Sequence, residues 1–135
     1  MGGELTGRLD RDYAGDSLPD YTFSKLDGEE LSLPSLTGQP VLLNLWATWC
    51  APCVVEMPML DDLAADYDGR LRVVTVSQDM QGEEVVAPFF EESEFAHLES
   101  WMDSKSDLAF HYGGGTALPT TILYDGEGKE VWRIV

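Results

Sequence analysis

Residues 41–53, with the sequence VLLNLWATWCAPC, decide the fold of this chain. The first six of them form a short apolar run, interrupted only by Asn44, of the kind found in central strands that are covered on both faces. The last four, residues 50–53, suit the start of a helix, because Pro52 fits a first helical turn, where its missing N–H costs no hydrogen bond. The stretch therefore predicts a buried strand that leads directly into the N-terminus of a helix.

A helix is expected directly after this strand. Between about residues 51 and 67 the apolar side chains repeat at spacings of three and four, which is the pattern of a helix with one buried face. Pro58 stands inside this pattern and is expected to kink the helix, because proline cannot donate a backbone hydrogen bond. Further along the chain, the patterns predict a strand over residues 71–76, a helix over 83–92 and a shorter helix over 106–112.

Two hairpins are expected near the two ends of the sequence. Alternating residues around the turn Asp27-Gly28 predict an early hairpin, and residues 120–124 and 131–134 predict another. Helices that alternate with strands and end in a hairpin predict an α/β fold, with a mixed central sheet flanked by helices. The polar residues 1–19 are expected to be a flexible N-terminal segment, followed by one domain over residues 20–135.

The overall charge excludes some classes of partner. The 135 residues carry a net charge of −17, which would repel the phosphates of nucleic acid and disfavours anionic membrane surfaces. A solvated acidic surface, adaptation to a salty habitat and a docking surface for a basic partner are all compatible with this charge. No apolar run approaches the length of a membrane span, and the first residues lack the pattern of a secretory signal.

The sequence holds two cysteines, Cys50 and Cys53, at the expected start of the helix. Unpaired backbone N–H groups and the helix dipole favour an anion there, so the thiol of Cys50 is expected to ionise readily. Cys53 lies one turn further on, close enough to attack a mixed disulfide formed at Cys50. We therefore expect Cys50 to be the nucleophile and Cys53 the resolving thiol of a thiol–disulfide exchange reaction.

Three other uses of the cysteine pair are open on these residues. A structural disulfide would close a very small loop and gain little chain entropy. A zinc site would need two further ligands, and His97 and His111 are too far apart for the usual zinc-binding spacing. Two thiols, aided by a methionine, suit Cu(I), so a Cu(I)-handling thiol module in oxidase assembly is the leading alternative function.

The residues around the cysteines resemble a known family. Residues 44–53, NLWATWCAPC, resemble the active-site strand and helix start of the thioredoxin superfamily. Residues 46–58, WATWCAPCVVEMP, are similar to its TlpA/ResA branch, which includes DsbE/CcmG-like proteins, and the resemblance extends from about Leu18 to Val135. It implies a thioredoxin-like fold and a thiol–disulfide oxidoreductase that needs no cofactor beyond a redox-active disulfide between its two cysteines.

The resemblance also implies partners and a location. Members of this branch are extracytoplasmic, usually membrane-tethered reductants that serve cytochrome c or copper-centre maturation. The implied partners are client proteins with disulfides and a membrane electron donor of the thiol-reducing type, and the implied location is the periplasm. A peroxidase is not expected, because Thr48 stands too close to Cys50 for the Thr-x-x-Cys spacing of that family.

Four residues take substrate-binding roles by the resemblance. Pro119 matches the cis-proline that faces the cysteine pair in the superfamily. The backbone of Leu118 is then expected to pair with an extended substrate segment, as in strand addition. Trp49 and Pro52 are expected to contact the substrate beside the disulfide.

Glu56 lies about one helical turn after Cys53 and is the remaining catalytic candidate. The family match favours its interpretation as a proton acceptor for Cys53. The alternative is a solvent-facing helix glutamate. Asn44 stands where cytosolic thioredoxins have an aspartate, so work as a general base is not expected at that position.

The end of the sequence departs from the family pattern. Thioredoxin-like domains finish with a helix over one face of the sheet, whereas this sequence stops at Val135 in its last expected strand. We therefore expect the C-terminal helix to be absent, and residues 1–19, a partner or a second copy to cover an apolar face. A membrane anchor is likewise expected to be missing. The glycine run at 113–115 is expected to be flexible beside the substrate groove.

Overall fold

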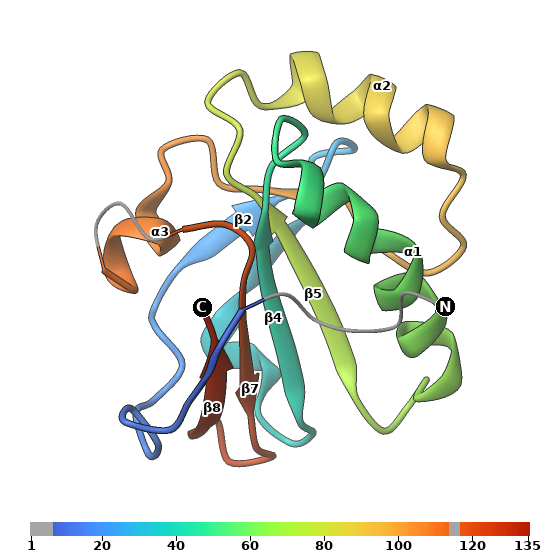
Figure 1. The fold of residues 1–135 in the computed structure, drawn as a ribbon. Coiled ribbons are helices and arrows are strands. Elements are labelled where there is room, and N and C mark those ends of the chain that lie inside the picture. The colour runs from blue at the N-terminus through green and yellow to red at the C-terminus, as the bar shows by residue number, and fades with distance from the viewer. Residues whose placement is uncertain (1–6, 114–116) are drawn as a thin grey trace.

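The computed structural model describes residues 7–113 and 117–135 of the chain (Figure 1). Most of the glycine run at 113–115 and the first six residues of segment 1–19 lie outside these ranges. Within the described ranges, every helix and hairpin expected from the sequence is present, with boundaries that differ by only a few residues. The local patterns in the sequence were therefore sufficient to predict the main elements.

The central strand and its helix form as the sequence predicts. Strand β4 (Val41–Trp46) is buried along its whole length, and helix α1 (Ala51–Asp66) follows it after a short turn. β4 pairs parallel with β5 (Arg72–Ser77) and antiparallel with β7 (Thr120–Tyr124), so the sheet is mixed. This arrangement places the start of α1 at the edge of the sheet where β4 and β5 end (Figure 1).

Shorter strands extend the sheet on both sides of this centre. In the described residues they are β1 (Leu9–Asp10), β2 (Thr22–Ser24), β3 (Glu30–Ser32), β6 (Trp101–Met102) and β8 (Glu130–Ile134). The order across the sheet is β1-β8-β7-β4-β5-β6-β2-β3. The hairpins β2–β3 and β7–β8 confirm the two predicted turns, whereas β1 and β6 were too short to leave a pattern in the sequence.

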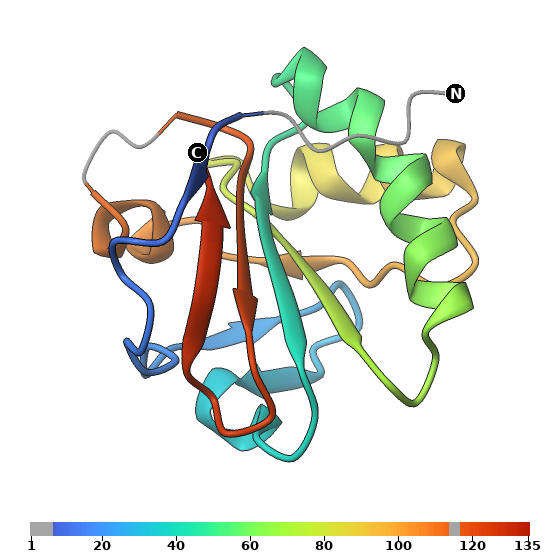
Figure 2. The same ribbon diagram turned by 60° about the horizontal axis from the view of Figure 1, so that its bottom comes forward.

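Helices cover both faces of the sheet. α1 and α2 (Glu83–Ser93) lie on one face, and α3 (Asp107–His111) and the 3₁₀ helix η1 (Leu33–Leu36) lie on the other (Figures 1 and 2). Of the helices within the described ranges, none has the length and apolar character needed to cross a bilayer. β8 is the last element of the described chain.

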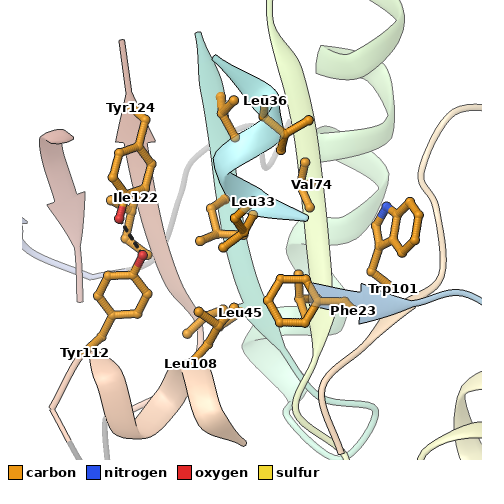
Figure 3. Close-up of a cluster of buried hydrophobic side chains, with 13 residues drawn as sticks. Phe23, Leu33, Leu36, Leu45, Val74, Trp101, Leu108, Tyr112, Ile122 and Tyr124 are labelled. Atoms are coloured by element: carbon orange, nitrogen blue, oxygen red, sulfur yellow. Dashed lines mark hydrogen bonds between the residues drawn. The ribbon is translucent and has the colours of Figure 1, made fainter. Parts of the chain in front are cut away.

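The hydrophobic core is divided between the two faces of β4. Leu43 and Leu45 belong to the cluster on the α3 face (Figure 3), whereas Leu42 and Trp46 belong to the cluster on the α1 face. Successive side chains of a strand point to opposite faces, so both sets are buried only when both faces are covered. This double burial explains why residues 41–46 contain no charged side chain.

Residues 7–19, the described part of the segment expected to be flexible, lie along the edge of the sheet and pair with it. β1 pairs antiparallel with β8, and the backbone N–H of Arg8 donates to the carbonyl of Val135 at 2.9 Å. Gly7 has a φ of +124°, and a Cβ there would lie 2.7 Å from the Val135 carbonyl oxygen. Only glycine tolerates both the positive φ and this close approach.

Candidate active site

The two cysteines form a disulfide at the junction of β4 and α1. Their Cα atoms are 5.3 Å apart, and Cys50 is the N-cap residue of α1. The backbone N–H of Cys53 donates to Sγ of Cys50 at 3.3 Å. In the reduced protein, the same N–H and the positive end of the helix dipole would stabilise a thiolate at Cys50. This geometry would favour an anionic sulfur at Cys50.

A buried carboxylate, which the sequence reasoning missed, holds the turn in front of the disulfide. Asp79 follows β5 and is only 1% exposed. Its oxygens accept hydrogen bonds from the backbone N–H of Thr48 at 3.0 Å, the Thr48 hydroxyl at 2.7 Å and the Ser77 hydroxyl at 2.7 Å. Thr48 is thus fixed two residues before Cys50. The available signal was a run of polar residues at the carboxyl end of a buried strand.

A second carboxylate ties α1 to the segment that follows α2. Asp61 accepts backbone hydrogen bonds from His97 at 2.8 Å, Leu98 at 2.9 Å and Ala96 at 3.2 Å. Burial alone would raise the pKa of Asp61, but these three N–H donors outweigh it and hold the pKa below its ordinary value of 3.8. The helix that carries the cysteines is therefore held at Asp61 by a charge-assisted contact.

The peptide bond between Leu118 and Pro119 is cis, as the family resemblance implied. Pro119 is buried directly before β7, whose first residue, Thr120, pairs with Leu45 of β4. Leu118 is half-buried and packs against the cluster that contains the two cysteines. The proline turn and the disulfide therefore lie at the same edge of the sheet.

Glu56 lies in the interior on α1, with only 2% of its surface exposed. The alternative of a solvent-facing helix glutamate is therefore wrong. Asn44, at the position where cytosolic thioredoxins have an aspartate, donates through Nδ2 to the Thr121 hydroxyl at 3.0 Å and so joins β4 to β7. Glu56 is thus the ionisable side chain that α1 places one turn beyond Cys53.

The two tryptophans beside the cysteines have opposite environments. Trp46 is fully buried and packs against Phe89 with ring centroids 4.9 Å apart, as expected for a core residue. Trp49 is 70% exposed and borders a groove of about 590 Å³. Pro52 is also exposed, at the open end of α1. Trp49 and Pro52 are therefore accessible to a partner that approaches the disulfide.

In the ranges that the structure describes, no three His, Cys, Asp or Glu side chains lie together in a way that could hold a metal ion. The two cysteine sulfurs are bonded to each other. This bond can be opened and closed by thiol–disulfide exchange.

Comparisons with known proteins agree with this geometry. The AhpC/TSA family matches residues 14–132. The thioredoxin-like protein YneN of Bacillus subtilis (strain 168) is 46% identical over 63 residues, which cover 47% of this chain and 37% of YneN. The thiol-disulfide oxidoreductase ResA of Bacillus thuringiensis (strain Al Hakam) is 31% identical over 121 residues, which cover 90% of this chain and 69% of ResA. The chain therefore spans just over a third of the length of YneN and about two thirds of that of ResA.

The fold also has a close counterpart among solved structures. The crystal structure of a putative thiol:disulfide interchange protein DsbE from Chlorobium tepidum aligns with a TM-score of 0.81 at 28% identity. The alignment covers 90% of this chain and 84% of that one.

Proposed function

The chain belongs to the AhpC/TSA family and, within it, to the ResA-like thiol–disulfide oxidoreductases, and from this premise we propose that it reduces disulfides of extracytoplasmic client proteins. One observation carries the proposal: the N–H of Cys53 donates to Sγ of Cys50 at the N-terminus of α1. This contact supports Cys50 as the thiol that ionises and attacks.

The proposed reaction is a dithiol–disulfide exchange. The Cys50 thiolate attacks one sulfur of the client disulfide, a bond forms between them, and the second client sulfur leaves as a thiolate. The Cys53 thiolate then attacks Sγ of Cys50 and releases the first client sulfur. Two electrons have moved to the client, whose thiolates take up two protons, and the chain is left with the Cys50–Cys53 bond seen here.

Glu56 is proposed to accept the proton of Cys53 during the second attack. Its burial on the same helix supports this role, because a buried carboxylate one turn beyond the thiol can exchange a proton without competition from bulk water. Glu56→Gln should therefore slow the resolution step and change its pH profile, while leaving the first attack by Cys50 unchanged.

The client is proposed to lie against Trp49, Pro52, Leu118 and Pro119. The exposure of Trp49 and Pro52 supports contact with a large partner. The backbone of Leu118 is offered to an extended client segment, which would add to the sheet edge as a short strand. These contacts would orient the client disulfide toward Cys50.

The finer assignments follow from the ResA-like resemblance. We propose that the clients belong to cytochrome c or copper-centre maturation, and that a thiol-reducing membrane protein returns two electrons to the disulfide. The proposed location is the periplasm or another extracytoplasmic compartment, with a membrane tether in the full-length protein. All these partners exchange electrons through thiols, which matches the sulfur chemistry of the site.

The central test is to trap the client. Cys53→Ser should accumulate mixed disulfides between Cys50 and its clients, because the resolving thiol is gone. The Cys50→Ser/Cys53→Ser double variant is the matched control and should trap none. A redox titration of the wild-type protein against glutathione should give the potential of a reductant.

Two outcomes would contradict the proposal. A potential near that of strong oxidants would reverse the direction of electron transfer. Tight stoichiometric Cu(I) binding by the reduced protein, together with no reduction of insulin or a client disulfide, would favour the Cu(I)-handling alternative instead.

A further inference from the structure

A groove beside the disulfide is formed by four segments of the chain. It has a volume of about 590 Å³. Trp49 and Leu118 border it on the side of the disulfide, the loop after β5 forms one wall, and α3 with the loop before it forms the other. The lining residues from these two walls are Gln78, Met80, Gln81, Ser104, Lys105, Ser106, Ala109 and Phe110.

The two walls are fixed to each other by the buried Gln78. Its carbonyl oxygen accepts a hydrogen bond from the Ser106 hydroxyl at 3.3 Å, and its side-chain oxygen accepts one from the backbone N–H of Ala109 at 3.3 Å. The backbone N–H of Gln78 donates to the carbonyl of Trp46 at 2.7 Å, which joins the wall after β5 to the end of β4. The groove therefore exists before any partner arrives.

Two large apolar side chains on the groove are mostly exposed to solvent. Met80 is 81% exposed and Phe110 is 69% exposed, from opposite walls. Together with Trp49 they form an apolar surface around a hollow next to the reactive bond. Contiguous apolar exposure of this kind marks a binding surface, because covering it removes the unfavourable contact with water.

The charged side chain in the lining of the groove is positive, although the protein is acidic overall. The net charge is −17, yet the lining contains one cation, Lys105, and no acidic side chain. Three of the seven other cations are in ion pairs: Lys25 and Arg72 pair with Glu99, and Arg133 pairs with Glu130. No ion pair detected within residues 7–113 and 117–135 includes Lys105.

We propose that this groove selects client segments that carry an apolar side chain and a carboxylate close to the reactive cysteine. The apolar side chain lies between Met80 and Phe110, and the carboxylate pairs with Lys105. The inference rests on the proposed function and names its substrate class. The negative net charge of the protein would repel a client that is acidic overall. The carboxylate of the client segment must therefore act on Lys105 at the short range of an exposed ion pair.

The test uses short peptides in which one cysteine is held as a mixed disulfide with 2-mercaptoethanol. One peptide carries Phe and Glu beside the cysteine, a second carries Phe and Lys, and a third carries Ser and Glu. Each order of the two flanking residues is made, because the direction of the bound segment is not assumed. The readout is the second-order rate constant of reduction, and neutral hydroxyethyl disulfide serves as a substrate that does not use the groove.

The wild-type chain should reduce the Phe–Glu peptide about tenfold faster than the other two, which corresponds to roughly 1.4 kcal/mol of discrimination. Lys105→Glu should reverse the preference between Glu and Lys, and Phe110→Ser or Met80→Ser should remove the preference for Phe. Lys129→Glu and Val55→Ser are matched controls, because they make the same kind of change at exposed positions outside the groove lining.

Equal rates for all peptides, or equal effects of Lys105→Glu and Lys129→Glu, would overturn the groove proposal. If the chain still reduced hydroxyethyl disulfide at the normal rate, the proposed function would stand and only the groove proposal would fail. A reduced wild-type chain that leaves hydroxyethyl disulfide unchanged would contradict the proposed function itself, and the groove proposal with it.

Discussion

Two regions of this molecule bury chemically distinctive side chains and use them differently. At the start of α1, the Cys50–Cys53 disulfide lies beside an open groove. On the opposite side of β7, the Glu130 carboxylate accepts two hydrogen bonds from the Arg133 guanidinium, each at 2.7 Å, and both side chains are buried. The guanidinium lies 3.7 Å from the ring centroid of Tyr13. The first region can change its covalent state, whereas the second is a closed pair.

The tyrosines next to this ion pair strengthen the contrast. Tyr112 and Tyr124 share a hydrogen bond between their hydroxyl groups (Figure 3). Burial raises the pKa of Tyr124 to about 12 and that of Tyr112 well above its ordinary value. These groups therefore keep one protonation state across the physiological range. A buried polar cluster whose protonation states are fixed stabilises the fold, whereas a disulfide that can open supplies chemistry.

The largest expected effect is on the reactive side of the comparison. Cys50→Ser should lower disulfide reduction to the background rate, because the remaining thiol, Cys53, is only 1% exposed. Its stability under reducing conditions should stay close to that of the wild-type protein, since the small disulfide loop is open in both. Peptide reduction and urea unfolding in dithiothreitol measure the two quantities. Residual activity above background would show that Cys53 can act as the attacking thiol.

The second prediction concerns the closed pair. Arg133→Met should lower the free energy of unfolding by about 3–5 kcal/mol, because it leaves the Glu130 carboxylate buried and unpaired. The Glu130→Leu/Arg133→Met double variant should recover most of this loss, since no charge then remains in the interior. Urea denaturation gives the stabilities, and the reduction rate per folded molecule should be unchanged. A double variant as unstable as the single one would show that packing, not charge, holds this region.

How far the sequence could predict each region depends on the range of its contacts. The strand over 41–46, its helix and the cysteine pair were readable because neighbouring residues carry their pattern. The groove wall at Lys105 and the packing of Tyr13 on Arg133 were not, because segments distant in the sequence meet there. The cis bond before Pro119 came from the family resemblance, since most X–Pro bonds are trans.

A smaller effect is expected where α1 is tied to the segment after α2. Asp61→Ala should cost about 1–2 kcal/mol, because three backbone N–H groups lose a charged acceptor. The pKa of Asp61 is lowered in the folded protein, so its contribution is present above the ordinary value of 3.8 and is lost as the pH falls through the folded-state value. The wild-type and variant stabilities should therefore converge in acid. A gap that stays constant between pH 6 and about 2 would contradict this assignment.

The smallest expected effect concerns the hydrogen bond between the two buried tyrosines. Tyr124→Phe removes the hydrogen bond to Tyr112 and should cost about 1 kcal/mol at neutral pH. Because burial raises the pKa of Tyr124 from 10.0 to about 12, the folded protein retains the phenol proton while the unfolded chain loses it. The contribution of Tyr124 is thus complete below pH 10 and falls as the pH rises toward about 12. The stability gap between wild type and Tyr124→Phe should narrow over this range in urea unfolding, and Tyr67→Phe, at an exposed tyrosine, is the matched control. A stability gap that does not change with pH would mean that water reaches the Tyr124 hydroxyl. The tyrosine cluster would then be open to solvent, and its contrast with the disulfide region would be lost.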